Sequence, residues 1–125
     1  MLNLNSVMVG TMQPKIMVDF YSKVFGKQPD MQEGEWAGWS MGSCFFSVGA
    51  HSEVTGKSTA PARIILNLET TEVKKEFDRI KEVGAEVVKE PYEMGDGMIA
   101  TFADPDGNYF QLMTPWSPEQ KDKSN

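Results

Sequence analysis

A chain of 125 residues with 18 acidic and 12 basic side chains carries a formal net charge of −6. Such a chain offers no positive surface to a polyanion, so we expect neither nucleic acid nor an anionic membrane as a partner. The length suits one domain with a hydrophobic core of its own. Cys44 is the only cysteine, which excludes an intramolecular disulfide.

The N-terminal residues do not have the pattern of a targeting sequence. Residues 1–5 lack a basic region followed by an apolar core. No apolar run approaches the roughly 20 residues that a membrane-spanning helix needs. We therefore expect a cytoplasmic protein.

The first half of the chain predicts a strand, a helix and two more strands. Residues 4–11 are strand-like, and after Pro14, a favourable residue for a first helical turn, apolar side chains recur at helical spacing. Gly26 is expected to end this helix. Short strand patterns follow at residues 36–41 and 44–48.

The same order returns in the second half. Ile64, Leu66 and Leu68 alternate as in a strand, and a helical pattern then runs to Gly84. Strand patterns follow at residues 85–89, 98–103 and 109–113, with residues 90–97 expected to form a mobile rim loop or wide turn.

This repetition predicts an α+β fold of two βαβββ modules, residues 4–49 and 62–115, within a single domain over residues 1–116. The polar residues 51–61 are expected to link the modules, and residues 117–125 to form a disordered tail. Each module has one helix, which covers one face of a sheet. Pairing the modules would place the helices outside a curved mixed sheet with a concave cleft, the natural place for a ligand.

The run Asp104-Pro105-Asp106-Gly107-Asn108 predicts a reverse turn between the last two strands. Proline fixes the φ angle that a turn needs at its second position, and glycine accepts a positive φ. We expect the acidic and amide side chains of the run to bind backbone N–H groups of the turn. A hairpin with its final strand at residues 109–113 follows.

Three features together resemble the vicinal oxygen chelate superfamily: the Phe20-Tyr21 pair followed by Val24-Phe25-Gly26, the helix end at Gly84, and the turn at residues 104–108. This superfamily includes glyoxalase I, bleomycin-resistance proteins, fosfomycin-resistance enzymes and extradiol dioxygenases. The similarity covers residues 4–115. It implies the glyoxalase/bleomycin-resistance fold and a homodimer.

The resemblance also indicates where metal ligands would lie, on the first and last strands of each module. The corresponding places here are Ser6, Arg63, Gln111 and one of the residues 45–47, a Phe-Phe-Ser run. None has a carboxylate or an imidazole, so the set would bind a transition metal very weakly. We expect no metal or other cofactor, and we assign no catalytic residue. The single histidine, His51, lies in the predicted linker.

Candidate ligand contacts come from strand alternation and from the aromatic residues of the strands. The set comprises Ser6, Met8, Trp36, Trp39, Phe46, Arg63, Asn67, Phe102, Tyr109 and Gln111. The guanidinium of Arg63 could hold a carboxylate or phosphate, or could instead form an ion pair or lie in solvent at a strand end. For the aromatic residues the alternative is core or dimer packing.

These features predict a glyoxalase/bleomycin-resistance-like protein that lacks the usual metal ligands and binds a small organic ligand, anionic or aromatic. The alternative is a metal-dependent lyase, isomerase or dioxygenase of the glyoxalase I type, in which a divalent metal polarises the substrate. A third possibility is an interaction module whose cleft is filled by its own side chains.

Overall fold

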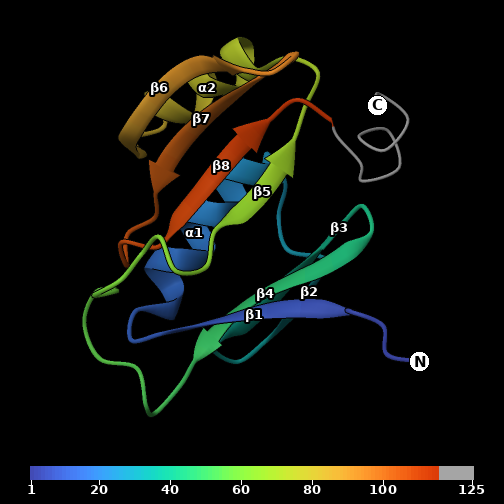
Figure 1. The fold of residues 1–125 in the computed structure, drawn as a ribbon. Coiled ribbons are helices and arrows are strands. Elements are labelled where there is room, and N and C mark those ends of the chain that lie inside the picture. Colours follow the sequence, from blue (N-terminus) through green and yellow to red (C-terminus); the bar gives the residue numbers. More distant parts are fainter. Residues whose placement is uncertain (116–125) are drawn as a thin grey trace. The chain divides into compact units, whose positions relative to one another are not determined.

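The computed structural model describes residues 1–115 and shows two compact units that divide after Ser58. Each unit is a βαβββ module with one helix and one four-stranded sheet (Figure 1). The α+β class and the two modules are therefore confirmed. The single domain over residues 1–116 stays a prediction, and the predicted tail at residues 117–125 lies outside the described residues.

The first module contains β1 (Ser6–Thr11), α1 (Pro14–Phe25), β2 (Met31–Glu33), β3 (Trp36–Met41) and β4 (Cys44–Ala50). The sheet order is β1-β4-β3-β2, with β1 parallel to β4 and the other pairs antiparallel. The sequence pattern missed β2, because its three residues are all exposed and show no alternation.

Helix α1 begins and ends where its sequence predicts. Pro14 lies in its first turn, and Gly26 adopts a left-handed φ of +71° while its backbone N–H donates to the carbonyl of Ser22. The buried face of the helix packs on the sheet: the Tyr21 ring lies 4.9 Å from that of Phe46, and the Phe25 ring lies 5.3 Å from that of Trp39. These contacts form the core of the first module.

The second module contains β5 (Leu66–Glu69), α2 (Val73–Glu82), β6 (Glu86–Met94), β7 (Gly97–Ala103) and β8 (Tyr109–Met113). The sheet order is β5-β8-β7-β6, and β5 runs parallel to β8. The ring of Phe77 on α2 stacks 5.0 Å from that of Phe102, which in turn lies 5.5 Å from that of Phe110. This stack joins helix and sheet.

Two expectations for the second half are wrong. The expected loop at residues 90–97 is mostly strand, since β6 continues to Met94 and pairs with β7. An edge strand tolerates Pro91, which lacks a backbone donor, and the pairing is irregular on either side of Lys89. Ile64 lies before β5 rather than in it, with 75% of its surface exposed.

The turn at residues 104–108 forms as predicted. The Asp104 carboxylate accepts hydrogen bonds from the backbone N–H groups of Asp106 (2.9 Å) and Asn108 (3.0 Å). The side-chain amide of Asn108 donates to the same carboxylate at 3.0 Å, and Gly107 has a φ of +84°. The motif therefore serves to shape the hairpin between β7 and β8.

Residues 51–65, between β4 and β5, contain neither helix nor strand. They include the expected linker at residues 51–61. Within the described part of the chain, no helix is both long enough and apolar enough to cross a membrane.

Candidate functional site

The first module has one sheet face turned to α1 and one turned away from it, which we call the helix-free face. Trp39 and Phe46 are opposite each other in the β3–β4 pair, and both rings contact Phe25 of α1. Because side chains alternate along a strand, the neighbouring positions point to the other side. The helix-free face therefore carries Ser6 and Met8 of β1, Phe45 and Ser47 of β4, and Trp36 of β3.

An aromatic platform lies on this face. The rings of Trp36 and Phe45 stack with their centroids 5.9 Å apart and their planes at 25°. A Cβ added to Gly38 would lie 2.3 Å from the Phe45 ring. One added to Gly49 would lie 3.0 Å from Trp36 and 3.1 Å from the Met8 methyl. The two glycines thus make the space in which these side chains lie.

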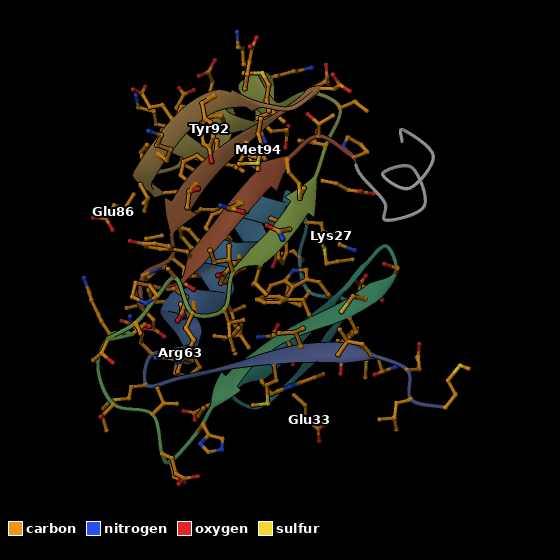
Figure 2. All side chains as sticks on the ribbon, viewed as in Figure 1. Lys27, Glu33, Arg63, Glu86, Tyr92 and Met94 are labelled. Atoms are coloured by element: carbon orange, nitrogen blue, oxygen red, sulfur yellow. The ribbon has the colours of Figure 1, made fainter. Side chains whose placement is uncertain are left out.

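We use the name aromatic platform for Met8, Trp36 and Phe45. Met8 is 52% exposed, and the two rings are half-buried. On the strands of the first module, the only charged side chain of the helix-free face is that of Glu33, which lies opposite Trp36 in the β2–β3 pair (Figure 2). The platform therefore offers stacking surface without a basic group beside it in its own sheet.

The second module has a helix-free face of different chemistry. Phe102 and Phe110 stack on the α2 side, so their neighbours Thr101 and Gln111 point away from the helix. Four side chains align directly across the sheet, one from each strand, and we call them the polar row: Asn67, Gln111, Thr101 and Lys89. The Gln111 amide donates to the Thr101 hydroxyl at 3.2 Å.

The residues predicted as ligand contacts divide between these faces and the two cores. Ser6, Met8 and Trp36 lie on the helix-free face of the first module, and Asn67, Tyr109 and Gln111 on that of the second. Trp39 and Phe102 are 0% exposed and Phe46 is 6% exposed, so these three pack in the cores, as the packing alternative stated.

Arg63 lies in neither face. It precedes β5 in an exposed bend, where its backbone N–H donates to the Ala60 carbonyl at 3.0 Å (Figure 2). The first-strand position that faces Gln111 is instead Asn67. Sequence reasoning misplaced Arg63 because β5 has only four residues, which is too few to fix a register by alternation.

Three contributors to the platform and the row were missed as site residues: Phe45, Thr101 and Lys89. Phe45 could have been found, because in the pair Phe45-Phe46 only one ring can face the helix. Lys89 could not, since irregular pairing on either side of it breaks the alternation of β6.

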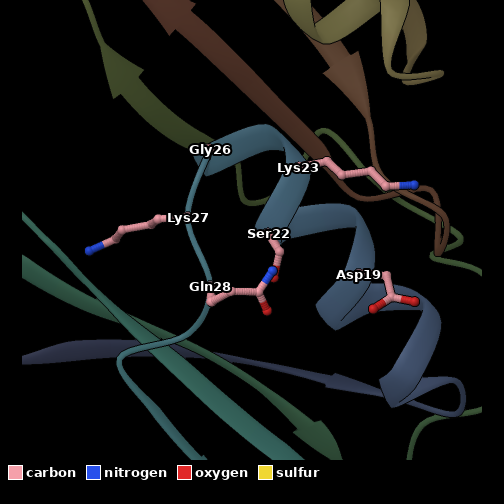
Figure 3. A pocket seen from close by; sticks show the side chains of 6 residues that line it. All are labelled: Asp19, Ser22, Lys23, Gly26, Lys27 and Gln28. Atoms are coloured by element: carbon pink, nitrogen blue, oxygen red, sulfur yellow. The ribbon is translucent and has the colours of Figure 1, made fainter.

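A hollow of about 360 Å³ also lies at the C-terminal end of α1 (Figure 3). Its lining includes Asp19, Ser22, Lys23 and Gln28. Lys27 borders it but is bound elsewhere, donating to the Asp30 carboxylate at 2.9 Å and to the Ser40 carbonyl at 3.0 Å. None of the predicted ligand contacts lines this hollow.

The family model of the Glyoxalase/Bleomycin resistance protein/Dioxygenase superfamily matches residues 3–112. The chain belongs to this superfamily. The resemblance to the vicinal oxygen chelate superfamily is thereby confirmed. No curated protein sequence matches the chain.

Solved structures share the fold of this superfamily member. A glyoxalase/bleomycin resistance protein/dioxygenase family enzyme from Burkholderia phytofirmans PsJN is 26% identical with a TM-score of 0.73, covering 90% of this chain and 98% of that one. A glyoxalase-related enzyme from Fulvimarina pelagi is 18% identical with a TM-score of 0.77, covering 92% and 89%. TnmS3, an antibiotic binding protein from Streptomyces sp. CB03234, is 22% identical with a TM-score of 0.72, covering 93% and 98%.

The superfamily includes metal-dependent members, so the donor chemistry of the strands matters. Paired positions on β1 and β4 hold Ser6 with Phe45 and Met8 with Ser47, and those on β5 and β8 hold Asn67 with Gln111. Hydroxyl, thioether and amide groups do not suit zinc, nickel or iron, which prefer thiolate, imidazole or carboxylate. Within residues 1–115, no three or more His, Cys, Asp or Glu side chains gather as a metal site would require.

The single histidine of this superfamily member does not join the strand positions. His51 is exposed after β4, and its Nδ1 accepts a hydrogen bond from the backbone N–H of Glu53 at 3.1 Å. The paired positions of β1 with β4 and of β5 with β8 therefore do not offer the donors that a transition metal prefers.

Proposed function

We propose that this superfamily member binds a small organic ligand without a metal, and that the aromatic platform is the main contact. The observation that carries the proposal is the glycine pair beneath the platform. Gly38 and Gly49 leave the space in which Phe45 and Trp36 lie against the sheet, while Met8 stays 52% exposed. A stacked pair of rings on a sheet face suits a flat, apolar ligand.

The energy available from such a surface is enough for binding in about the millimolar range. Covering about 100 Å² of apolar surface contributes roughly 2.5 kcal/mol. Ring stacking adds about 0.5–1.5 kcal/mol when the geometry is favourable. The hydroxyls of Ser6 and Ser47 lie on the same face and supply polar contacts.

The similarity to TnmS3 supports a binding role, since that protein is described as an antibiotic binding protein. At 22% identity this likeness concerns the fold, so the ligand of TnmS3 is not transferred to this chain. The case for ligand binding here rests on the platform itself.

The test titrates 1-naphthamide, a neutral flat probe, into the full chain. Calorimetry and the changes in amide chemical shifts both measure its affinity. The W36A variant should weaken binding roughly tenfold, because it removes about 1–2 kcal/mol of stacking and apolar contact. G38A should also weaken binding, because the added methyl group would displace the Phe45 ring.

I16A is the matched control, because Ile16 is an exposed apolar residue of α1 and is not part of the platform. The I16A variant should bind 1-naphthamide with the affinity of the wild type. If W36A and G38A both fold and bind 1-naphthamide as the wild type does, the platform is not the ligand site.

A homodimer and a cytoplasmic location also belong to this proposal. The homodimer follows from the family resemblance, and sedimentation velocity of the full chain measures it directly. A sedimenting mass equal to the 14.0 kDa of one chain would contradict it.

A further inference from the structure

We infer that the polar row of the second module is a recognition site for a carboxylate, with Lys89 as its cationic contact. The inference rests on the proposed ligand-binding function and names a chemical class of ligand. It begins from the alignment of Asn67, Gln111, Thr101 and Lys89 across the four strands of one sheet.

The Thr101 hydroxyl of the row can donate a hydrogen bond. The Thr101 hydroxyl accepts from the Gln111 amide at 3.2 Å, so its own proton is left for another acceptor. Within the described residues, no hydrogen bond uses that proton, and Thr101 is only 6% exposed. A hidden hydroxyl gains more from a charged acceptor than an exposed one does.

Lys89 supplies the positive charge at one end of the row. Its Nζ lies 5.5 Å from the centre of the Tyr92 ring, which keeps the ammonium beside the sheet face. None of the ion pairs among residues 1–115 includes Lys89. Its charge is therefore open to an incoming anion.

The surroundings of the row strengthen a polar contact at Thr101. On the same face, the flanking positions of β7 and β8 hold Ile99, Met113, Ala103 and Tyr109, which are all buried or half-buried. An apolar surround lowers the local dielectric constant and strengthens a hydrogen bond to the Thr101 hydroxyl, whereas Lys89 is exposed on the edge strand β6, where an ion pair contributes less. Among the acids near the row, Glu86 lies three residues before Lys89 and pairs with Ala103, and Glu69 lies two residues after Asn67 and pairs with Met113. Glu90 follows Lys89 directly, within the irregular pairing of β6.

The single charge selects the class of anion. One ammonium with neighbouring amide and hydroxyl donors matches the charge of a carboxylate, whereas a phosphate dianion would leave one charge uncompensated. Neighbouring strands lie about 4.8 Å apart, so the row spans roughly 14 Å. A carboxylate at the Lys89–Thr101 end leaves the amides of Gln111 and Asn67 for another polar group of the ligand.

The experiment compares 1-naphthoate with 1-naphthamide, which have the same ring system and differ in charge. Both are titrated into the full chain, and the amide and side-chain resonances of Thr101, Gln111 and Lys89 are followed. Naphthoate should shift these resonances. K89M should weaken naphthoate binding by up to roughly fivefold while leaving naphthamide unchanged, and K89R should restore most of the loss.

K81M is the matched control, since it removes the same charge from an exposed position of α2. T101V provides a second variant and should weaken the binding of naphthoate alone.

Equal naphthoate affinity in wild type, K89M and T101V would overturn the inference. Naphthamide binding, and with it the proposed function, would remain intact. Binding of neither probe would overturn both. Displacement of naphthoate by inorganic phosphate more readily than by acetate would contradict the carboxylate assignment.

Discussion

Asp104 uses its carboxylate within its own turn. The oxygens accept hydrogen bonds from two backbone N–H groups and from the Asn108 side chain, and Asp104 is only 4% exposed. The turn amides lose their hydrogen bonds to water when they are buried, and the bonds to the Asp104 carboxylate replace them. The residue therefore acts on the stability of the hairpin.

We predict that D104A lowers the free energy of unfolding by roughly 1–3 kcal/mol, because buried donors lose a charged acceptor. Urea denaturation measures the change. D96N serves as the control, since Asp96 is exposed in the turn between β6 and β7, and its stability should match that of the wild type. A stable D104A protein would show that the turn does not depend on this carboxylate.

At the same scale, the sequence indicates which residues are aromatic but not which sheet face each one occupies. Trp36 and Trp39 are three positions apart on β3, so they point to opposite faces, and only one can be a ligand contact. The contact of Trp39 with Phe25 assigns it to the core. That contact joins residues distant in sequence, and alternation alone cannot supply it.

The segment between α1 and β3 is held by a cluster around Asp30. The Asp30 carboxylate accepts from the Ser40 backbone N–H at 2.7 Å and from Lys27 Nζ at 2.9 Å. The Trp39 indole donates to the Lys27 carbonyl at 3.2 Å. These bonds connect the end of α1 to β3.

The same hydrogen bonds lower the pKa of Asp30 from its ordinary value of 3.8. The bond from the Ser40 N–H has the largest effect, and the bond from Lys27 has the next largest.

A lowered carboxyl pKa in the folded state gives a definite dependence of stability on pH. The stabilisation from ionised Asp30 is present above the unfolded value of 3.8 and is lost as the pH falls through the lower folded value. We predict that D30N is less stable than the wild type at neutral pH and that the difference shrinks below pH 3.8. Urea denaturation across this range measures it. E35Q, which changes an exposed turn residue, is the control, and its stability should depend on pH as that of the wild type does.

At the scale of elements, helices and most strands follow from the sequence, and the exceptions have physical causes. Both helices end near glycines with positive φ, Gly26 and Gly84, which the chain shows plainly. The long β6 was hidden because Pro91 and the nearby glycines also suit a loop. Arg63 was assigned to a strand that begins three residues later. Short or irregular strands leave register to tertiary contacts.

At the scale of the whole molecule, the repeated module was predictable because each half repeats the same order of elements. The polar row was not predictable as a site, since it depends on the registry of four strands at once. The paired positions Asn67 and Gln111 of β5 and β8 carry amides, which transition metals do not favour as ligands, and this chemistry supports the proposed metal-free binding.

We predict that adding zinc, nickel or ferrous iron to chelator-treated protein leaves its melting temperature unchanged. A metal that binds the folded state alone would raise the melting temperature by mass action. Scanning fluorimetry measures this, and elemental analysis of protein purified without chelator gives an independent value. A near-stoichiometric transition metal would contradict the proposed metal-free binding.

The hydrogen bonding of Asp104 within the turn at residues 104–108 has a consequence for how related proteins are sorted. A carboxylate that binds the backbone of its own turn helps to set the shape of a hairpin, so chains with unrelated chemistries can share the motif. Searching on this pentapeptide would collect proteins by architecture. Under the proposed function, grouping them by what they recognise requires comparing the positions equivalent to Gly38, Gly49 and Lys89, where a single substitution would alter the proposed recognition surfaces.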